Sequence, residues 1–264
     1  MREDEIITLD ERIMTPSIRA AAASDIGRRQ EQQDAILSLE RNNMYIFAVC
    51  DGMGGMNSGG VASETAVRVL EKDFQCLAEQ ESVEDFLISE VKKIDSIIEE
   101  LKDENGQSLK CGTTMVTVVV RGQEVSWASV GDSKIFFIRN GKIITLTREH
   151  NYRLSLDILK KRGMISQEYY NREVVNGEAL ISYLGMGKIS LIDTSPEKIV
   201  LQKDDVLLLC SDGLYKNMEK EEILHTVQQY QNMKEAVDAL IKKTISKRRD
   251  NQDNITVVLI KYTL

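Results

Sequence analysis

Two apolar segments of the chain lead to the same pair of residues, an aspartate followed by a glycine. Residues 45–50 run directly into Asp51 and Gly52, and residues 206–210 run through Ser211 into Asp212 and Gly213. Short apolar runs bounded by glycine indicate buried strands, so each run would deliver a carboxylate to the edge of the core. Burying two ionised carboxylates near each other is costly, and a divalent cation offsets that cost. Because the donors are oxygen atoms, we expect magnesium or manganese.

Three further aspartates lie at or beside the end of an expected strand, namely Asp34, Asp132 and Asp253. A single aspartate in such a place is most often a turn or cap residue. Five of them are harder to explain in this way. Moreover, Asp51, Asp132 and Asp212 each adjoin a glycine, which lets the backbone approach a ligand closely. We therefore treat all five as candidate metal ligands.

The elements that must position these carboxylates follow from hydrophobic periodicity. Residues 1–16 would form a loose arm or an edge strand, and residues 18–24 a strand or a helix. Strands are expected at 35–39, 45–50, 113–120, 124–130, 135–138, 143–146, 198–201, 206–210 and 255–262. Helices are expected at 61–80, from a Ser82 cap to about 102, and at 152–162, 219–229 and 234–247.

The four strands between residues 113 and 146 are joined by short turns, one of them Asn140-Gly141, so we expect an antiparallel meander. Antiparallel strands with separate pairs of amphipathic helices predict an α+β fold in which helices cover sheets.

Composition narrows the classes of function. The 264 residues include 34 Lys and Arg against 42 Asp and Glu, a net charge of −8, which disfavours binding to nucleic acid. No window approaches the ~20 apolar residues of a membrane span, and the first residues lack the pattern of a signal peptide. We expect a cytoplasmic protein that does not associate with membranes. The four cysteines show no CxxC spacing and the two histidines are too few for a His-rich zinc site.

The chain resembles the metal-dependent protein phosphatase family (PPM, type 2C) over about residues 18–262. Any one Asp-Gly pair is weak evidence, but seven stretches occur in the family's order and approximate spacing. They are Ser24-Asp-Ile-Gly-Arg-Arg29 with Gln33-Asp34, Cys50-Asp-Gly-Met-Gly-Gly55, Cys111-Gly-Thr-Thr114, Ser129-Val-Gly-Asp-Ser-Lys134, Leu146-Thr-Arg-Glu-His150, Leu208-Leu-Cys-Ser-Asp-Gly-Leu214 and Asp253-Asn-Ile-Thr256.

The resemblance implies a four-layer α-β-β-α sandwich, in which two antiparallel sheets are flanked by helix pairs and residues 17–264 form one catalytic domain. It also implies hydrolysis of phosphoserine and phosphothreonine in proteins with two, or three, Mn²⁺ or Mg²⁺ ions. The phosphoproteins would be substrates of a serine/threonine kinase, and we expect a monomer.

Roles for individual residues are implied in the same way. Asp51 is similar to the carboxylate that bridges two ions, and Gly52 to a residue whose carbonyl binds one. Asp212 and Asp253 resemble ligands of one of these ions. Asp34 resembles a carboxylate that serves the cluster through waters.

Two more residues complete the implied site. Asp132 is similar to the ligand of a third, weaker ion in bacterial members. Arg29 resembles the arginine that grips the substrate phosphate, because a guanidinium offers a planar fork to two phosphate oxygens. Two ions lower the pKa of a bridging water, so Arg29, Asp34 and Asp51 would act without a covalent enzyme nucleophile.

The sequence departs from the family's pattern at two positions. Gln33 stands where many members carry Glu, so we expect weaker metal binding rather than lost activity. Met53 stands where many eukaryotic members have a histidine. Bacterial relatives often have Met at this position, so we expect activity to survive. Residues 151–192 align with the variable flap beside the active site, which we expect to influence substrate choice.

Three other classes compete with this interpretation. A pseudophosphatase that binds phosphoproteins without hydrolysis is supported by Gln33, but the retained Asp51, Asp212 and Asp253 argue against it. A two-metal nuclease uses similar ligands, but the negative charge disfavours it. A purely structural domain leaves the aspartates unexplained.

Overall fold

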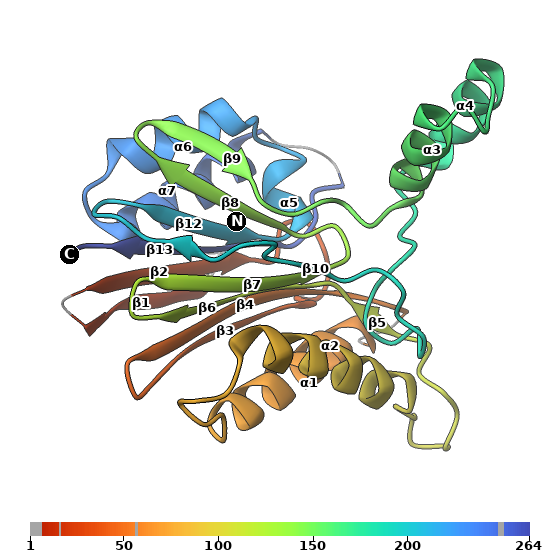
Figure 1. Ribbon diagram of the computed structural model, residues 1–264. Coiled ribbons are helices and arrows are strands. Elements are labelled where there is room, and N and C mark those ends of the chain that lie inside the picture. The colour runs from red at the N-terminus through yellow and green to blue at the C-terminus, as the bar shows by residue number, and fades with distance from the viewer. Residues whose placement is uncertain (1–6, 16, 56–57, 248–250) are drawn as a thin grey trace.

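The structure of the protein is a computed structural model that describes residues 7–15, 17–55, 58–247 and 251–264. Its strands form two antiparallel sheets stacked face to face (Figure 1). The six-stranded sheet has the order β1 (Ile7–Thr15), β2 (Ile18–Asp25), β13 (Ile255–Tyr262), β12 (Val206–Cys210), β8 (Lys134–Arg139) and β9 (Lys142–Thr145). The seven-stranded sheet has the order β10 (Asp193–Thr194), β7 (Glu124–Val130), β6 (Met115–Arg121), β4 (Met44–Met53) and β3 (Asp34–Arg41), with β11 (Ile199–Val200) beside β7 and β5 (Gly112–Thr113) beside β4.

Helices cover the outer face of each sheet. Helices α1 (Ser58–Phe74) and α2 (Val83–Glu99) pack on the seven-stranded sheet, and α6 (Lys220–Gln229) and α7 (Met233–Ser246) pack on the six-stranded sheet (Figure 1). The expected four-layer α-β-β-α sandwich of the α+β class is confirmed.

Strand β4 illustrates why the sheets stack in this way. Side chains of successive strand residues point to opposite faces, and both faces of β4 are apolar. Tyr45, Phe47 and Val49 enter the core between the two sheets. The alternate residues Ile46 and Ala48 enter the core beneath α1 and α2. A strand that is apolar at every position is thus explained by burial on both sides.

The hairpin turn predicted at Asn140-Gly141 is confirmed, and a second hairpin has the same turn geometry. The β3–β4 turn contains Asn42 and Asn43 with φ of 51° and 58°, and the β8–β9 turn contains Asn140 and Gly141 with φ of 51° and 71°. Positive φ at both central positions is the geometry of two-residue hairpin turns, which Asn and Gly tolerate best. Of the first sixteen residues, 7–15 form an edge strand, while 1–6 and 16 lie outside the described residues. Residues 18–24 belong to strand β2.

The predicted meander is wrong. Strands β6 and β7 pair within the seven-stranded sheet, whereas β8 and β9 pair within the six-stranded sheet. The chain crosses between the sheets at Gly131, whose φ of +97° favours glycine and whose Cβ would lie 2.6 Å from the Thr114 side chain. Periodicity identifies strands but does not identify their partners.

Helix boundaries also differ from the expected ones. The helix expected at 61–80 begins at Ser58 and ends at Phe74. A turn follows the helix, and this turn, without any further helical residues, brings Leu77 into the core. The helix capped by Ser82 ends at Glu99, three residues earlier than expected, and the Ser82 hydroxyl accepts the Asp85 N–H as predicted.

Residues 151–192 are the segment that the resemblance identifies as the flap. Helices α3 (Tyr152–Lys161) and α4 (Gln167–Glu173), followed by a 3₁₀ turn at Val174–Asn176, make an arm that projects from the sandwich (Figure 1). The base of the flap is fixed by the buried Asp95 carboxylate of α2, which accepts the N–H groups of residues 185, 186 and 187 at 2.8, 2.9 and 3.1 Å. None of the helices among the described residues is both long and apolar enough to cross a membrane.

Candidate active site

The structure brings the five candidate aspartates together at one end of the sandwich. Asp34 and Asp51 are direct partners across the β3–β4 ladder. Asp132 lies at the crossing between the sheets, Asp212 begins the short helix α5 (Asp212–Tyr215) after β12, and Asp253 precedes β13. Both sheets therefore contribute carboxylates to the same place.

Electrostatics support this convergence. Burial raises the pKa of Asp51 well above its ordinary value, and the charges of Asp34, Asp212, Asp132 and Asp253 raise it further. Burial likewise raises the pKa of Asp34 to about 7 and that of Asp132 to about 6, with Asp212 adding to both. Carboxylates that perturb one another in this way favour a bound cation over the metal-free state.

Buried carboxylate oxygens without a hydrogen-bond partner also indicate a site for a cation. Among the described residues, Asp34 Oδ1 and Asp212 Oδ1 are buried without a hydrogen-bond partner. An unpaired buried carboxylate oxygen is costly, and coordination to a cation would satisfy it. The residues present therefore fit an oxygen-liganded divalent ion.

Gly52 lets the backbone of β4 pass unusually close to α1. A Cβ at this position would lie 2.1 Å from the carbonyl oxygen of Gly59 and 2.6 Å from that of Gln33. The Gly52 N–H donates to the Gln33 carbonyl at 3.1 Å. A side chain therefore cannot be accommodated where the carbonyl ligand is expected.

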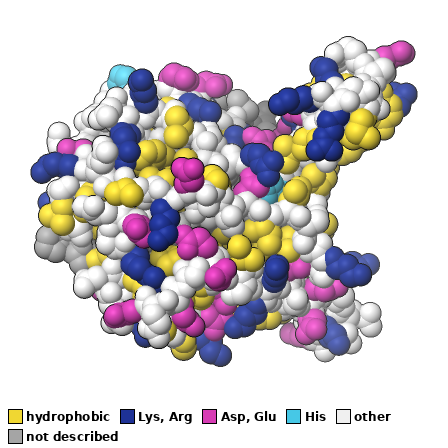
Figure 2. All heavy atoms as spheres, viewed as in Figure 1, with side chains coloured by type: hydrophobic (Ala, Val, Ile, Leu, Met, Phe, Trp, Pro, Cys, Tyr) yellow, Lys and Arg dark blue, Asp and Glu magenta, His cyan; other side chains and the backbone are white. Residues whose placement is uncertain are grey.

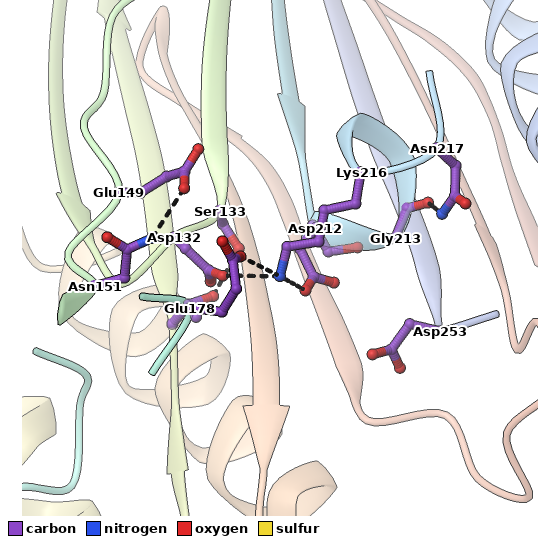
Figure 3. A network of polar contacts seen from close by, with 12 residues as sticks. Asp132, Ser133, Glu149, Asn151, Glu178, Asp212, Gly213, Lys216, Asn217 and Asp253 are labelled. Carbon is purple, nitrogen blue, oxygen red and sulfur yellow. Dashed lines mark hydrogen bonds and ion pairs between the residues drawn. The ribbon is translucent and has the colours of Figure 1, made fainter. Parts of the chain in front are cut away.

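Positive side chains neutralise part of the cluster. In the described part of the chain, no three His, Cys, Asp or Glu side chains form a ready-made metal centre. Instead the Arg29 guanidinium pairs with Asp253 at 2.7 Å, and the Lys216 ammonium pairs with Asp212 at 2.7 Å. Although burial lowers it, neighbouring carboxylates, led by Asp212, raise the pKa of Lys216 above its ordinary value. Figure 3 shows Lys216 reaching from α5 toward the carboxylates.

Arg29 lies at the rim. Its side chain is 56% exposed, and it lines a depression of about 400 Å³ together with Arg28, Gln30, Glu31, Gln33 and Gly54. A half-exposed guanidinium beside buried carboxylates is well placed to meet an anionic ligand entering from solvent.

Two hydroxyl residues that the sequence did not single out hold the central carboxylates. The Ser211 hydroxyl donates to Asp34 Oδ2 at 2.7 Å. The Thr114 hydroxyl accepts the Asp51 N–H at 3.1 Å, and the Thr114 N–H donates to the Asp51 carbonyl at 2.8 Å. Ser211 and Thr114 both lie within the motifs quoted from the sequence, but the motifs did not indicate which groups these hydroxyls contact.

Asn254 and His150 position the backbone around the site. The Asn254 side chain accepts the Gln33 N–H at 2.9 Å and donates to the carbonyls of Ile26 and Glu31, which ties β13 to the Arg29 loop. His150 is fully buried and accepts the Gly131 N–H at 3.2 Å through Nδ1, which fixes the turn that carries Asp132. Both residues lie within the motifs quoted from the sequence, which did not indicate these roles.

Comparisons with known proteins agree with the fold and the site. The family described as Protein phosphatase 2C matches residues 22–248. The serine/threonine phosphatase stp of Listeria welshimeri is 33% identical over 232 residues, covering 85% of this chain and 87% of that protein. Protein phosphatase 1K of Xenopus laevis, a mitochondrial protein, is 28% identical and covers 92% of this chain and 68% of its own length.

Solved structures are similar as well. The serine/threonine phosphatase of S. agalactiae superposes with a TM-score of 0.79 at 26% identity, over 92% of this chain and 99% of that one. The PPM Ser-Thr phosphatase MsPP from Mycobacterium smegmatis, in complex with cacodylate, has a TM-score of 0.70 at 28% identity, over 92% and 97% of the two chains. The resemblance stated from the sequence is confirmed, and the chain belongs to the protein phosphatase 2C family.

Proposed function

We propose that the protein is a metal-dependent phosphatase that hydrolyses phosphoserine and phosphothreonine in proteins. The observation that carries this proposal is the convergence of five aspartates from both sheets beside an exposed arginine, with the pKa values of Asp34, Asp51 and Asp132 raised by burial and by their neighbours. The relatives named serine/threonine phosphatase support the same substrate class. The cacodylate complex of MsPP supports it too, because cacodylate is a tetrahedral oxyanion like phosphate.

The residues that would hold the ions are those of the cluster. Asp51 and the carbonyl of Gly52, together with Asp212 and Asp253, would bind two Mn²⁺ or Mg²⁺ ions, with Asp34 acting through waters. When bound, such ions supply an activated water and neutralise the charge of the phosphate.

The chain's own residues prepare this chemistry. Arg29 would turn its fork from Asp253 to the oxygens of the phosphate, since a half-exposed side chain is free to reorient. Ser211 holds Asp34 and Thr114 holds the backbone of Asp51, so the two central carboxylates are fixed before substrate arrives. Fixed donors and acceptors reduce the reorganisation that the reaction requires.

The first experiment measures hydrolysis of p-nitrophenyl phosphate and of a phosphothreonine peptide with manganese, with a chelator, and with Asp212→Asn. We expect turnover that needs manganese and falls by at least about 100-fold in the variant, the size of loss seen when one group that stabilises a transition state is removed. Asp85→Asn, an exposed residue in the first turn of α2, is the matched control and should keep wild-type turnover. Chelator-resistant turnover, or full turnover by Asp212→Asn, would refute the proposed site.

The inactive alternative is less favoured. Gln33 is the residue that supports a pseudophosphatase. Against it, the relatives at 33% and 32% identity are named phosphatases. Manganese binding without any turnover on either substrate would restore this alternative.

We also propose that the flap contributes to substrate choice. Figure 2 shows basic and apolar side chains gathered on the projecting arm. Ile158, Met164, Tyr169 and Val175 are exposed apolar residues of the arm, and its basic residues are Arg153, Lys160, Lys161, Arg162 and Arg172. A phosphorylated segment is anionic, so a basic arm with apolar contacts suits it. Replacing the arm with that of another family member should change the preference among phosphopeptides, and an unchanged preference would exclude this role.

Three wider expectations remain proposals. The phosphoproteins would be substrates of a serine/threonine kinase, and the protein would act as a monomer in the cytoplasm. All four cysteines are free, three of them buried, which supports a reducing compartment. Light scattering in solution tests the oligomeric state.

A further inference from the structure

Lys216 extends from α5 into the aspartate cluster and contacts carboxylates from three separate elements. Its Nζ lies 2.7 Å from Asp212 Oδ2, 3.5 Å from Asp132 Oδ2 and 3.6 Å from Glu178 Oε2. Asp212 stands at the start of α5, Asp132 at the crossing between the sheets, and Glu178 in the flap. Figure 3 shows the three carboxylates directed toward the single ammonium group.

These three ion pairs differ in electrostatic strength. The side chains of Asp132 and Asp212 are 9% and 17% exposed, whereas that of Glu178 is 56% exposed. Ion pairs of buried carboxylates are screened less by water and salt than exposed pairs. The Asp132–Lys216–Asp212 bridge is therefore the substantial part of the arrangement, and Glu178 adds a weak contact from the flap.

The position of Lys216 is fixed by the fold. Asp212 and Lys216 are four residues apart, and residues at this spacing lie on the same side of a helical turn. Asp212 is the first residue of α5 and Lys216 directly follows its last residue, so the Lys216 side chain lies on the same side of the helix as the Asp212 carboxylate. The Asp212 oxygen lies 2.7 Å and the Asp132 oxygen 3.5 Å from the ammonium, so both carboxylates face the same positive charge.

We infer that Lys216 is a built-in cation that occupies the position of a divalent ion between Asp132 and Asp212. This inference rests on the proposed metal-dependent function. The chain then binds two divalent ions, through Asp51, Asp212 and Asp253, and the charge of Asp132 is balanced by Lys216 rather than by a third ion. A lysine amine delivers one positive charge without needing a free ligand from solution, so Asp132 stays neutralised whatever the metal concentration.

The test is a count of bound Mn²⁺ ions on the full chain without substrate, by equilibrium dialysis with metal analysis and by calorimetric titration. We expect two ions per wild-type chain and three for Lys216→Met, the third binding more weakly than the first two. Adding Asp132→Asn to Lys216→Met should return the count to two. Lys220→Met, an exposed lysine at the start of α6, is the matched control and should bind two.

Other counts overturn the inference. Three ions in the wild type would show that Lys216 does not fill the position, and two ions in Lys216→Met would show that removing it does not open one. Lys216→Gln, which keeps a polar side chain, repeats the measurement if the methionine variant does not fold. No bound ions in any variant would overturn the proposed metal dependence itself, so the two failures are distinguishable.

Discussion

Glu90 is a carboxylate buried between α1 and α2, outside the aspartate cluster. It is 6% exposed, and among the described residues its Oε2 has no hydrogen-bond partner. Burial, together with the hydrogen bond to Asp73 and the charge of Asp73, raises the pKa of Glu90 to about 7. Lys93 pairs with Asp73, which keeps Asp73 ionised, so the shared proton belongs to Glu90.

This shift has a definite consequence for stability. The ordinary pKa of the group is 4.5 and the folded value about 7, and each unit corresponds to about 1.4 kcal/mol, so the difference is worth about 3 kcal/mol. The folded state holds the proton more tightly than the unfolded state. The contribution is therefore fully present below pH 4.5 and is lost as the pH rises to about 7. Glu90→Gln keeps an N–H donor for Asp73 and cannot ionise.

The assay is urea unfolding at several pH values between about 5 and 8, with chelator present to remove the effect of metals. We expect the free energy of unfolding of Glu90→Gln to exceed that of the wild type increasingly with pH, by up to about 3 kcal/mol at pH 8. Glu64→Gln, an exposed change on α1, is the matched control and should track the wild type. A difference between Glu90→Gln and wild type that does not vary with pH would refute the reasoning.

Three further changes are expected to have distinct effects. Gly52→Ala should lower Tm and abolish turnover, because its Cβ would lie 2.1 Å from the Gly59 carbonyl; wild-type Tm would contradict this. Gln33→Glu should tighten manganese binding in a titration, since it adds a carboxylate beside the cluster, and unchanged affinity would count against it. Asp95→Asn should speed hydrogen exchange of the amides at 185–187, because the carboxylate that accepts all three is weakened; unchanged protection would exclude Asp95 as the anchor of the flap.

Much of the fold could be predicted because its strands are continuous apolar runs. Strands β7, β12 and β13 have the predicted bounds, since each is buried on both faces and bounded by polar or glycine residues. The division of β6–β9 between two sheets could not be predicted, because the partner of a strand depends on segments that are distant in the sequence. The decisive local feature is Gly131, whose positive φ turns the chain toward the other sheet.

The candidate site, like the fold, could be predicted from the sequence only in part. The aspartates were predictable because Asp-Gly after an apolar run is a local pattern. The partners that fix or neutralise them are not local: Ser211 reaches Asp34 across 177 positions, and Lys216 reaches Asp132 across 84. Lys216 also directly follows a four-residue helix, which is too short for periodicity to reveal. The resemblance supplied roles for motif residues, but it did not supply these contacts.

The place of β13 in its sheet has a consequence for synthesis of the protein. This strand lies between β2 and β12, and Ile18 of β2 is paired with Tyr262. Strand β2 is therefore separated from the rest of its sheet until β13 has left the ribosome. Asp253 directly precedes the same strand. Until then a nascent chain would hold β1 and β2 paired only with each other, and its candidate site would lack Asp253.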